Sequence, residues 1–150
     1  MVQALKLQTP VQALTLRIPR GAMRTPPVAA PRLLTVNLGD TFYADVYASN
    51  NTGSDVTKDI LVAYGEYDPS TGQFTMYWGY VADNVTIPVG DNVMVASIEC
   101  VAEQLGTWDV LAATGTYDPS TGTFTIETAI VKEDELTVTG VTVTDVQIHT

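Results

Sequence analysis

The chain has 150 residues, about the length of one domain, and 45% of them are hydrophobic, so we expect a packed core and exclude global disorder. It carries 17 acidic and seven basic residues, a formal net charge of -10. One cysteine excludes an internal disulfide scaffold, and one histidine leaves little material for histidine-based catalysis or metal binding. No apolar run approaches the roughly 18 residues of a membrane helix, so we expect no membrane partner.

The part of the chain before Asp40 differs in composition from the remainder. It holds five of the seven basic residues, whereas the part from Asp40 onward holds two basic and all 17 acidic residues, a formal charge of -15. Five of the eight prolines lie at or before Pro31, and proline disfavours long helices and central strands. We therefore predict a basic, proline-rich extended arm at 1–32 and an acidic body at 33–150. The first residues lack the features of a secretory signal, so we expect use without ordinary secretion.

Apolar residues in the arm follow a strand-like order. The segment 2–7 (VQALKL) recurs nine residues later as 11–16 (VQALTL), and apolar side chains alternate from Leu14 to Ile18. Ordering an extended arm costs roughly 1–2 kcal/mol of backbone entropy per residue, so a neighbouring subunit or partner is expected to hold it. The alternative is a disordered tail. The candidate contact residues of the arm are Leu5, Leu7, Leu14, Leu16, Arg17, Ile18, Arg20 and Arg24.

Short apolar runs separated by turn residues predict a series of strands in the body. The expected strands are 33–38, 41–48, 60–67, 73–81, 93–101, 107–117, 123–131 and 136–148, with a short edge strand at 85–89. Many short strands at this spacing are typical of a sandwich or barrel. We therefore predict an all-β fold: an antiparallel β-sandwich with the extended arm and an extra C-terminal strand.

One internal repeat stands out in the body. The sequence YDPSTG at 67–72 returns at 117–122, and the match extends outward at the same spacing, with Gly115 equivalent to Gly65 and Phe124 equivalent to Phe74. Proline and glycine at these positions are typical of a β-hairpin turn, with a tyrosine and a phenylalanine facing each other where the strands begin. A calcium-binding loop is the weaker interpretation, because each loop supplies one carboxylate.

The repeat also suggests how the side chains divide between faces. The apolar residues at alternate positions from 74 to 80 are expected to share a side that faces the core. Tyr64 and Tyr77 are replaced by Thr114 and Glu127 in the second copy, and we expect both tyrosines on an outward face. They are candidate contacts for a partner or a sugar, with scattered surface tyrosine as the alternative.

Several stretches resemble a known family. The sequence NLGDTF at 37–42, the strand leading to NNTG at 50–53, and GTWDV at 106–110 are similar to bacterial immunoglobulin-like domains of the adhesion-related type. The resemblance covers about residues 33–132. It implies an immunoglobulin-like sandwich of a kind used for binding and display on cell surfaces and phage particles, and the fold does not choose between these roles.

Sequence motifs for catalysis are missing. No metal-ligand spacing, phosphate loop, dinucleotide fingerprint or nucleophile motif occurs, and we expect Cys100 to be a buried thiol. We therefore expect no enzyme activity and no cofactor. The acidic body would repel nucleic acid, so no nucleic-acid partner is expected.

These expectations favour a non-enzymatic structural protein of a virus or phage particle, a capsid-decoration or minor virion protein located in the virion. Its arm would contact neighbouring copies of the chain or a major capsid protein. The alternative is a cell-surface adhesion or carbohydrate-binding module, in which Tyr64, Tyr77 and Trp78 would contact the ligand.

Overall fold

The computed structural model describes residues 3–6, 14–19, 21–24 and 33–150, and these form strands, turns and irregular segments with no α-helix. The expected all-β class is confirmed. No helix capable of crossing a membrane occurs among these residues. The strands are β1 (Gln3–Lys6), β2 (Leu14–Arg17), β3 (Leu34–Asn37), β4 (Thr41–Asn50), β5 (Val56–Asp68), β6 (Gln73–Ile87), β7 (Gly90–Val101), β8 (Gly106–Asp118) and β9 (Thr123–Thr139).

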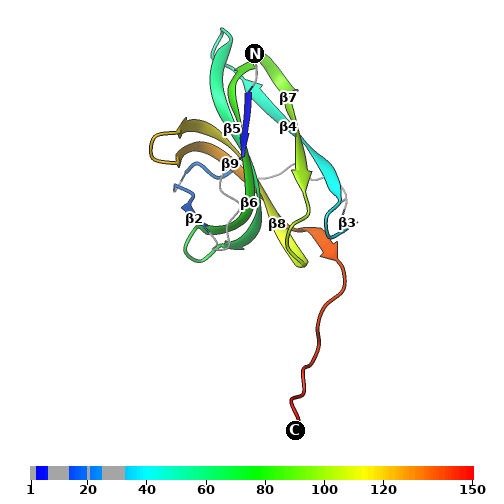
Figure 1. Cartoon of the computed structure of the whole chain (residues 1–150). Helices are drawn as coiled ribbons and strands as arrows, with labels where there is room; N and C mark the ends of the chain where they lie inside the picture. Colours follow the sequence, from blue (N-terminus) through cyan, green and yellow to red (C-terminus); the bar gives the residue numbers. More distant parts are fainter. Residues whose placement is uncertain (1–2, 7–13, 20, 25–32) are drawn as a thin grey trace.

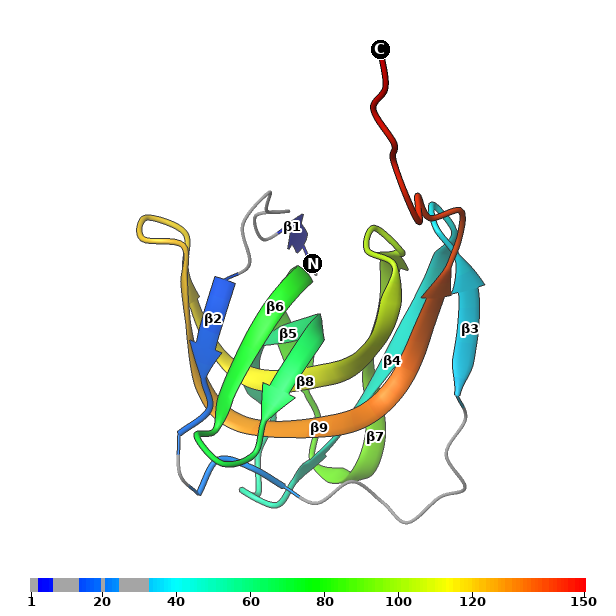
Figure 2. The same ribbon diagram turned by 90° about the horizontal axis from the view of Figure 1, so that it is seen from below.

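The strands form two sheets, consistent with a β-sandwich (Figures 1 and 2). The larger sheet has the order β1-β6-β5-β8-β9-β3, with β2 also paired to β6, and the smaller sheet consists of β4 and β7. Strand β3 pairs with β9 in parallel, from Leu34 opposite Leu136 to Asn37 opposite Thr139. The expectation of a purely antiparallel sandwich is therefore wrong at this edge, while the other pairings are antiparallel.

Two predicted strands differ from the structure. The expected separate edge strand at 85–89 is the end of β6, where Val85 to Ile87 pair with β5. The expected extra strand at 136–148 is also wrong as a separate strand: residues 136–139 are the end of β9, which continues from Thr123. Residues 140–150 lie in no strand and project away from the body (Figures 1 and 2).

The body consists of two similar three-stranded units. Strands β4, β5 and β6 are followed by β7, β8 and β9, and the repeat of the sequence relates β5 to β8 from the first residue to the last. Across the β5–β8 pair, Asp59 lies opposite Gly115 and Gly65 lies opposite Asp109. In the repeat, Asp109 is the counterpart of Asp59, and Gly115 is the counterpart of Gly65. Replacing each residue by its counterpart therefore turns the pair Asp59–Gly115 into the pair Asp109–Gly65. An approximate twofold axis between β5 and β8 therefore relates the two units.

Both predicted hairpins are confirmed. Gly72 and Gly122 close the two turns with φ of 74° and 70°, a left-handed conformation that favours glycine. In the first turn, the Asp68 carboxylate accepts hydrogen bonds from the backbone N–H of Ser70 at 3.0 Å and from its hydroxyl at 2.6 Å. The tyrosine and phenylalanine that flank each turn lie directly opposite each other, as the repeat predicts.

Each hairpin contains one β-bulge near its turn. The β5–β6 ladder skips Tyr77, and the β8–β9 ladder skips the equivalent Glu127. A glycine lies at each irregularity, Gly65 in β5 and Gly115 in β8. A Cβ atom on either glycine would lie 1.9 Å from a carbonyl oxygen of the facing strand. Glycine is therefore required at both positions by the close approach of two backbones.

The bulges change which side chains share a face. Phe74 and Met76 lie in one hydrophobic cluster, whereas Trp78 lies in another on the opposite face of the large sheet. The expectation that alternate residues from 74 to 80 share one side is wrong, because an extra residue in the strand reverses the alternation. The Trp78 cluster is covered by β4 and β7, and the Phe74 cluster includes Ile18 and Ala22 of the arm.

Candidate interaction site

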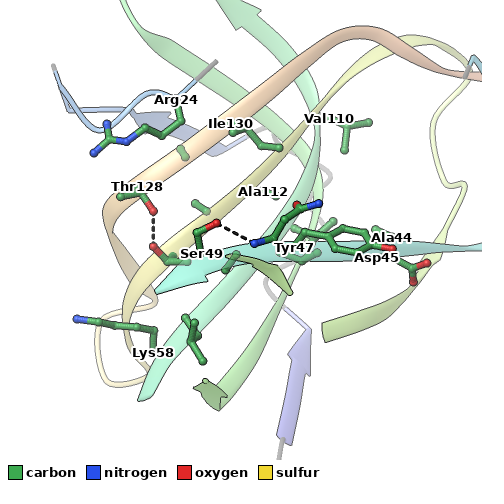
Figure 3. Close-up of a pocket in the computed structure, with 18 of the residues that line it drawn as sticks. Arg24, Ala44, Asp45, Tyr47, Ser49, Lys58, Val110, Ala112, Thr128 and Ile130 are labelled. Carbon is green, nitrogen blue, oxygen red and sulfur yellow. Dashed lines mark hydrogen bonds between the residues drawn. The ribbon is translucent and has the colours of Figure 1, made fainter. Parts of the chain in front are cut away.

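A cleft lies beside the unpaired edge of β4. Among the strands that the structure describes, β4 pairs only with β7, so its other edge retains unpaired backbone groups. The cleft has a volume of about 1100 Å³ and lies between β4 and the β8–β9 hairpin (Figure 3). Apolar residues on its walls include Ala44, Val46, Ala48, Val110, Ala112 and Ile130. An open edge beside an apolar cleft can accept an added strand.

The equivalent space beneath β7 is filled by aromatic side chains. The ring of Tyr64 stacks on Trp78, with 5.6 Å between centroids and 9° between planes. Tyr80 also lies against the indole, with 4.8 Å between the ring centroids. Tyr64 and Trp78 are 2% and 0% exposed, so this half of the molecule has a complete core.

Smaller side chains occupy the same positions beneath β4. In the second copy of the repeat, the counterparts of Tyr64, Trp78 and Tyr80 are Thr114, Thr128 and Ile130, and all three line the cleft. The hydroxyls of Thr114 and Thr128 share a hydrogen bond of 2.6 Å, visible as a dashed line in Figure 3. The loss of aromatic volume in the second unit therefore explains the cleft.

A further pair of equivalent positions shows the same difference. Tyr77 of the first unit lies against Trp108 of the second unit, with ring centroids 4.8 Å apart. The counterparts of this aromatic pair are Glu127 and Lys58, whose charged groups form an ion pair at 2.8 Å. Lys58 and Glu127 both line the cleft, so the cleft has an ion pair at the position where the other half has the contact between Tyr77 and Trp108.

The outward face of β4 carries two exposed aromatic side chains. Tyr43 is 66% exposed and Tyr47 is 54% exposed. They alternate with Ala44 and Val46, which face the other sheet. A strand added beside β4 would therefore find apolar partners on both of its faces.

The arm provides strands to the outer edge of β6. Strand β1 pairs with the region from Tyr80 to Asp83, and β2 pairs with the region from Gln73 to Met76. Beyond β2, the backbone N–H of Ile18 donates to the carbonyl of Gly72 at 3.0 Å, and Ile18 is 6% exposed. The arm residues therefore contribute to the core, and the predicted division at residue 33 stays a prediction.

The arm candidates fall into several groups. Leu5 lies in β1 and Leu14 in β2, while Leu7 and Arg20 lie outside the described residues. Leu16 packs against the Phe74 cluster. Arg17 and Arg24 are exposed, and the Arg24 guanidinium donates to the carbonyl oxygen of Gly21 at 2.5 Å. The apolar candidates with described side chains, Leu16 and Ile18, therefore face the body, and the basic ones face solvent.

Neither predicted surface tyrosine forms an outward patch. The expectation for Tyr64 is wrong, because its face of β5, shared with Ile60 and Val62, is covered by β4 and β7. The Tyr64 hydroxyl donates to the carbonyl of Val101 at 2.9 Å and accepts from the N–H of Glu103 at 2.8 Å. Burial raises the pKa of Tyr64 to about 12. Tyr77 is half-buried against Trp108.

Two carboxylates connect the hairpins in a way that sequence reasoning missed. Asp59 accepts hydrogen bonds from the N–H groups of Tyr117 at 2.7 Å and Asn84 at 3.0 Å, and its counterpart Asp109 accepts from Tyr67 at 2.7 Å. Burial opposes the charge of Asp59, but these hydrogen bonds outweigh it and hold the pKa below its ordinary value. The equivalence of the two aspartates within the repeat is the signal that could have identified them.

Among the residues that the structure describes, the cysteine and the acidic side chains form no second candidate site. Cys100 is 1% exposed, as the sequence predicts for a buried thiol, and burial raises its pKa to about 12. Within the described ranges, no group of three or more histidine, cysteine, aspartate or glutamate side chains could hold a metal ion. Comparison with protein-family models, with curated proteins and with solved structures found no match to the chain.

Proposed function

We propose that this chain is a non-enzymatic structural subunit of a virus or phage particle, in which the N-terminal arm of one copy contacts the body of a neighbouring copy or a major capsid protein. The body would be an immunoglobulin-like module, as the sequence resemblance implies. The observation that carries the proposal is a difference between two equivalent sheet edges. The edge of β6 pairs with the arm strands β1 and β2, whereas most of the equivalent edge of β9 has no described strand beside it.

The approximate twofold axis identifies the edge of β9 that has no described strand along most of its length. Residues 73–76 and 80–83 of β6 pair with β2 and β1, and their counterparts in β9 are 123–126 and 130–133. On that side, the described pairings of β9 are β3 beyond residue 135 and a single bridge between Met23 and Ala129. Apart from Ala129, whose backbone groups bond to Ala22 and Arg24, an arm from a second copy would meet on β9 a backbone arrangement like that which β1 and β2 meet on β6.

The side chains beside this edge also resemble those beside β6. Phe124 and Ile126 are the counterparts of Phe74 and Met76, and all four belong to the cluster against which Leu16 packs. Exposed ion pairs between the basic arm and the acidic body contribute about 0–1 kcal/mol each and are screened by salt. Backbone pairing and leucine burial, at about 25 cal/mol per Å² of apolar surface, would therefore provide most of the affinity.

A pair of cysteine variants tests the exchange of arms. Thr15 lies directly opposite Thr75 in the β2–β6 pair, and the counterpart of Thr75 is Thr125. Thr15→Cys with Thr125→Cys should form disulfide-linked dimers and ladders under oxidation. The control, Thr15→Cys with Thr75→Cys, should form a bond within one chain. The buried Cys100 should not interfere. Nonreducing gels that show only monomers for the first variant, in concentrated protein and in native particles, would contradict arm exchange.

The mass and shape of the native sample separate this proposal from the adhesion alternative. A structural subunit should form oligomers or bind particles, as measured by light scattering, co-sedimentation and electron microscopy. The side chains that motivated the sugar-binding alternative are largely withdrawn from solvent, since Tyr64 is 2% exposed and Trp78 is 0% exposed. A monomer that binds oligosaccharide and no particle would favour that alternative.

A further inference from the structure

The C-terminal segment, residues 140–150, has a strand-like sequence and no strand partner among the described residues. It leaves the end of β9 and projects away from the body (Figures 1 and 2). Four of its apolar side chains are almost fully exposed: Val141 at 95%, Val143 at 89%, Val146 at 80% and Ile148 at 95%. A β-branched segment of this kind gains stability only when it pairs with a sheet.

We propose that the C-terminal segment of one copy adds as a strand to the open edge of β4 in a second copy and fills the cleft there. The inference rests on the proposed function, and it names a second contact between subunits that does not use the N-terminal arm. Main-chain hydrogen bonds to β4 would hold the strand, and alternate side chains would enter the cleft.

The size of the segment matches the edge. Residues 140–150 span roughly 36 Å when extended, at about 3.3 Å per residue, and β4 has ten residues. The cleft walls beneath β4 carry alanine, valine and threonine where the other half carries aromatic rings, so the space lacks the side chains that complete the other half. The incoming strand would supply them.

The alternation of the segment determines which side faces the cleft. In an extended strand, Val146 and Ile148 share a face with threonines, and that face carries no charged side chain. The opposite face carries Asp145 and His149, which would be costly to bury in an apolar cleft. Val146 and Ile148 therefore enter the cleft.

The opposite face of the segment also finds partners. Val141 and Val143 lie on the same side as Asp145 and would face outward beside β4. The outward face of β4 carries Tyr43 and Tyr47 in exposed positions. Pairs of aromatic and β-branched side chains on neighbouring strands stabilise a sheet, so the two exposed tyrosines would gain cross-strand contacts.

The structure favours a second copy over the chain's own cleft. The segment is directed away from the body, and the amide of Gln147 donates locally, to the carboxylate of Asp145 at 3.2 Å. The cleft stays open while the segment is present in the same chain. Removal of residues 140–150 leaves every described strand intact, so a chain that ends at Thr139 should fold.

The test measures binding of a fluorescent peptide with the sequence of residues 140–150 to the chain that ends at Thr139, by anisotropy. We expect saturable binding. Ile148→Asp in the peptide should weaken binding by about 30-fold or more, equivalent to about 2 kcal/mol, because a charge would enter the apolar cleft. The matched control, Gln147→Asp on the outward face, should change binding by less than about threefold.

A second variant closes the cleft with the side chains of the other half. Thr114→Tyr together with Thr128→Trp copies the stacked aromatic pair, and it should abolish peptide binding without lowering the melting temperature. Thr86→Trp, at an exposed position of β6 outside the cleft, is the control and should bind the peptide normally. If the double variant does not fold, the peptide series on the unchanged body still decides the question.

Three results would overturn the proposal. The first is no peptide binding to the shortened chain, together with equal masses of the full and shortened chains. The second is equal weakening by Ile148→Asp and Gln147→Asp. The third is peptide binding to the shortened chain while the full chain stays monomeric, which would place the segment in its own cleft. In each case, persistence of the arm disulfide between copies would show that the proposed function itself stands.

Discussion

Gly65→Ala tests the close approach of strands at the first bulge. The added Cβ would lie 1.9 Å from the carbonyl oxygen of Thr75 and 2.9 Å from its carbonyl carbon, both backbone atoms that cannot rotate away. The two strands must therefore separate locally, which weakens their hydrogen bonds and disturbs the packing of Met76. Overpacking costs about 1–3 kcal/mol and each weakened hydrogen bond about 0.5–1.5 kcal/mol, so we expect a loss of about 2–4 kcal/mol.

The assay is reversible unfolding in urea, monitored by circular dichroism, together with thermal melting. For a chain of this size, about 3 kcal/mol corresponds to a decrease in melting temperature of roughly 6–12 °C. Gly115→Ala should have a similar effect, because its Cβ would meet the carbonyl oxygen of Thr125 at the same distance. Gly122→Ala is the control: Gly122 has a left-handed φ and no atom within 4 Å of the added Cβ, so only about 1 kcal/mol should be lost.

If Gly65→Ala is no more destabilising than Gly122→Ala, the close approach at the bulge is not what requires glycine there. A large effect at Gly65 and none at Gly115 would refute the equivalence of the two units. Equal and large effects at Gly65 and Gly115 would support both the close approach of the strands and the equivalence of the two units.

Three further predictions concern single side chains. Gly122→Val should lose roughly 1–3 kcal/mol through backbone strain alone, and an unchanged urea midpoint would contradict the left-handed turn. Hydrogen bonds from Ser70 lower the pKa of Asp68, so the stability that this group contributes is present above its unfolded value of about 3.9 and is lost as pH falls through the folded pKa. Ser70→Ala should raise the Asp68 pKa in a carboxyl NMR titration, and no change would exclude the serine as its cause. Because Cys100 is buried and its pKa is raised to about 12, it should react with a thiol reagent at mildly alkaline pH only after denaturation, and rapid reaction of the folded chain would contradict its burial.

The strand pattern of the body could be predicted from the sequence because its turns use strong signals. The repeated YDPSTG turns place both hairpins correctly, and the alternation of apolar residues locates the strands from Thr41 to Val131, except that it divides β6 in two. The bulges could not be located in this way, since a period of two residues gives no sign of an added residue. Trp78 was therefore expected on the wrong face, whereas Tyr64 was expected in solvent because the covering of its face by β4 and β7 could not be predicted. The paired glycines, Gly65 and Gly115, were the only local hint.

The candidate site was harder to predict because it depends on a difference between two units that are alike in sequence. The replacement of Tyr64 by Thr114 can be read from the sequence. That it opens a cleft could be predicted only by knowing that β7 covers Tyr64 and that β4 lies over Thr114. The segment after Leu136 shows a second limit. Its alternating valines predict a strand, yet in the chain by itself only the part as far as Thr139 finds a partner among the described residues.

The joining of the two units in one polypeptide has a consequence for how the cleft could arise. In a symmetric dimer of separate three-stranded chains, every substitution occurs twice, so the loss of an aromatic residue would hollow both halves of the core together. A covalent link removes that constraint. One half can keep its tyrosines and tryptophan and hold the fold, while the other accumulates threonine and alanine at little cost to the whole. A dimer of identical chains could not have the asymmetry between Trp78 and Thr128, whereas a tandem chain can keep one half packed while the other half carries the cleft.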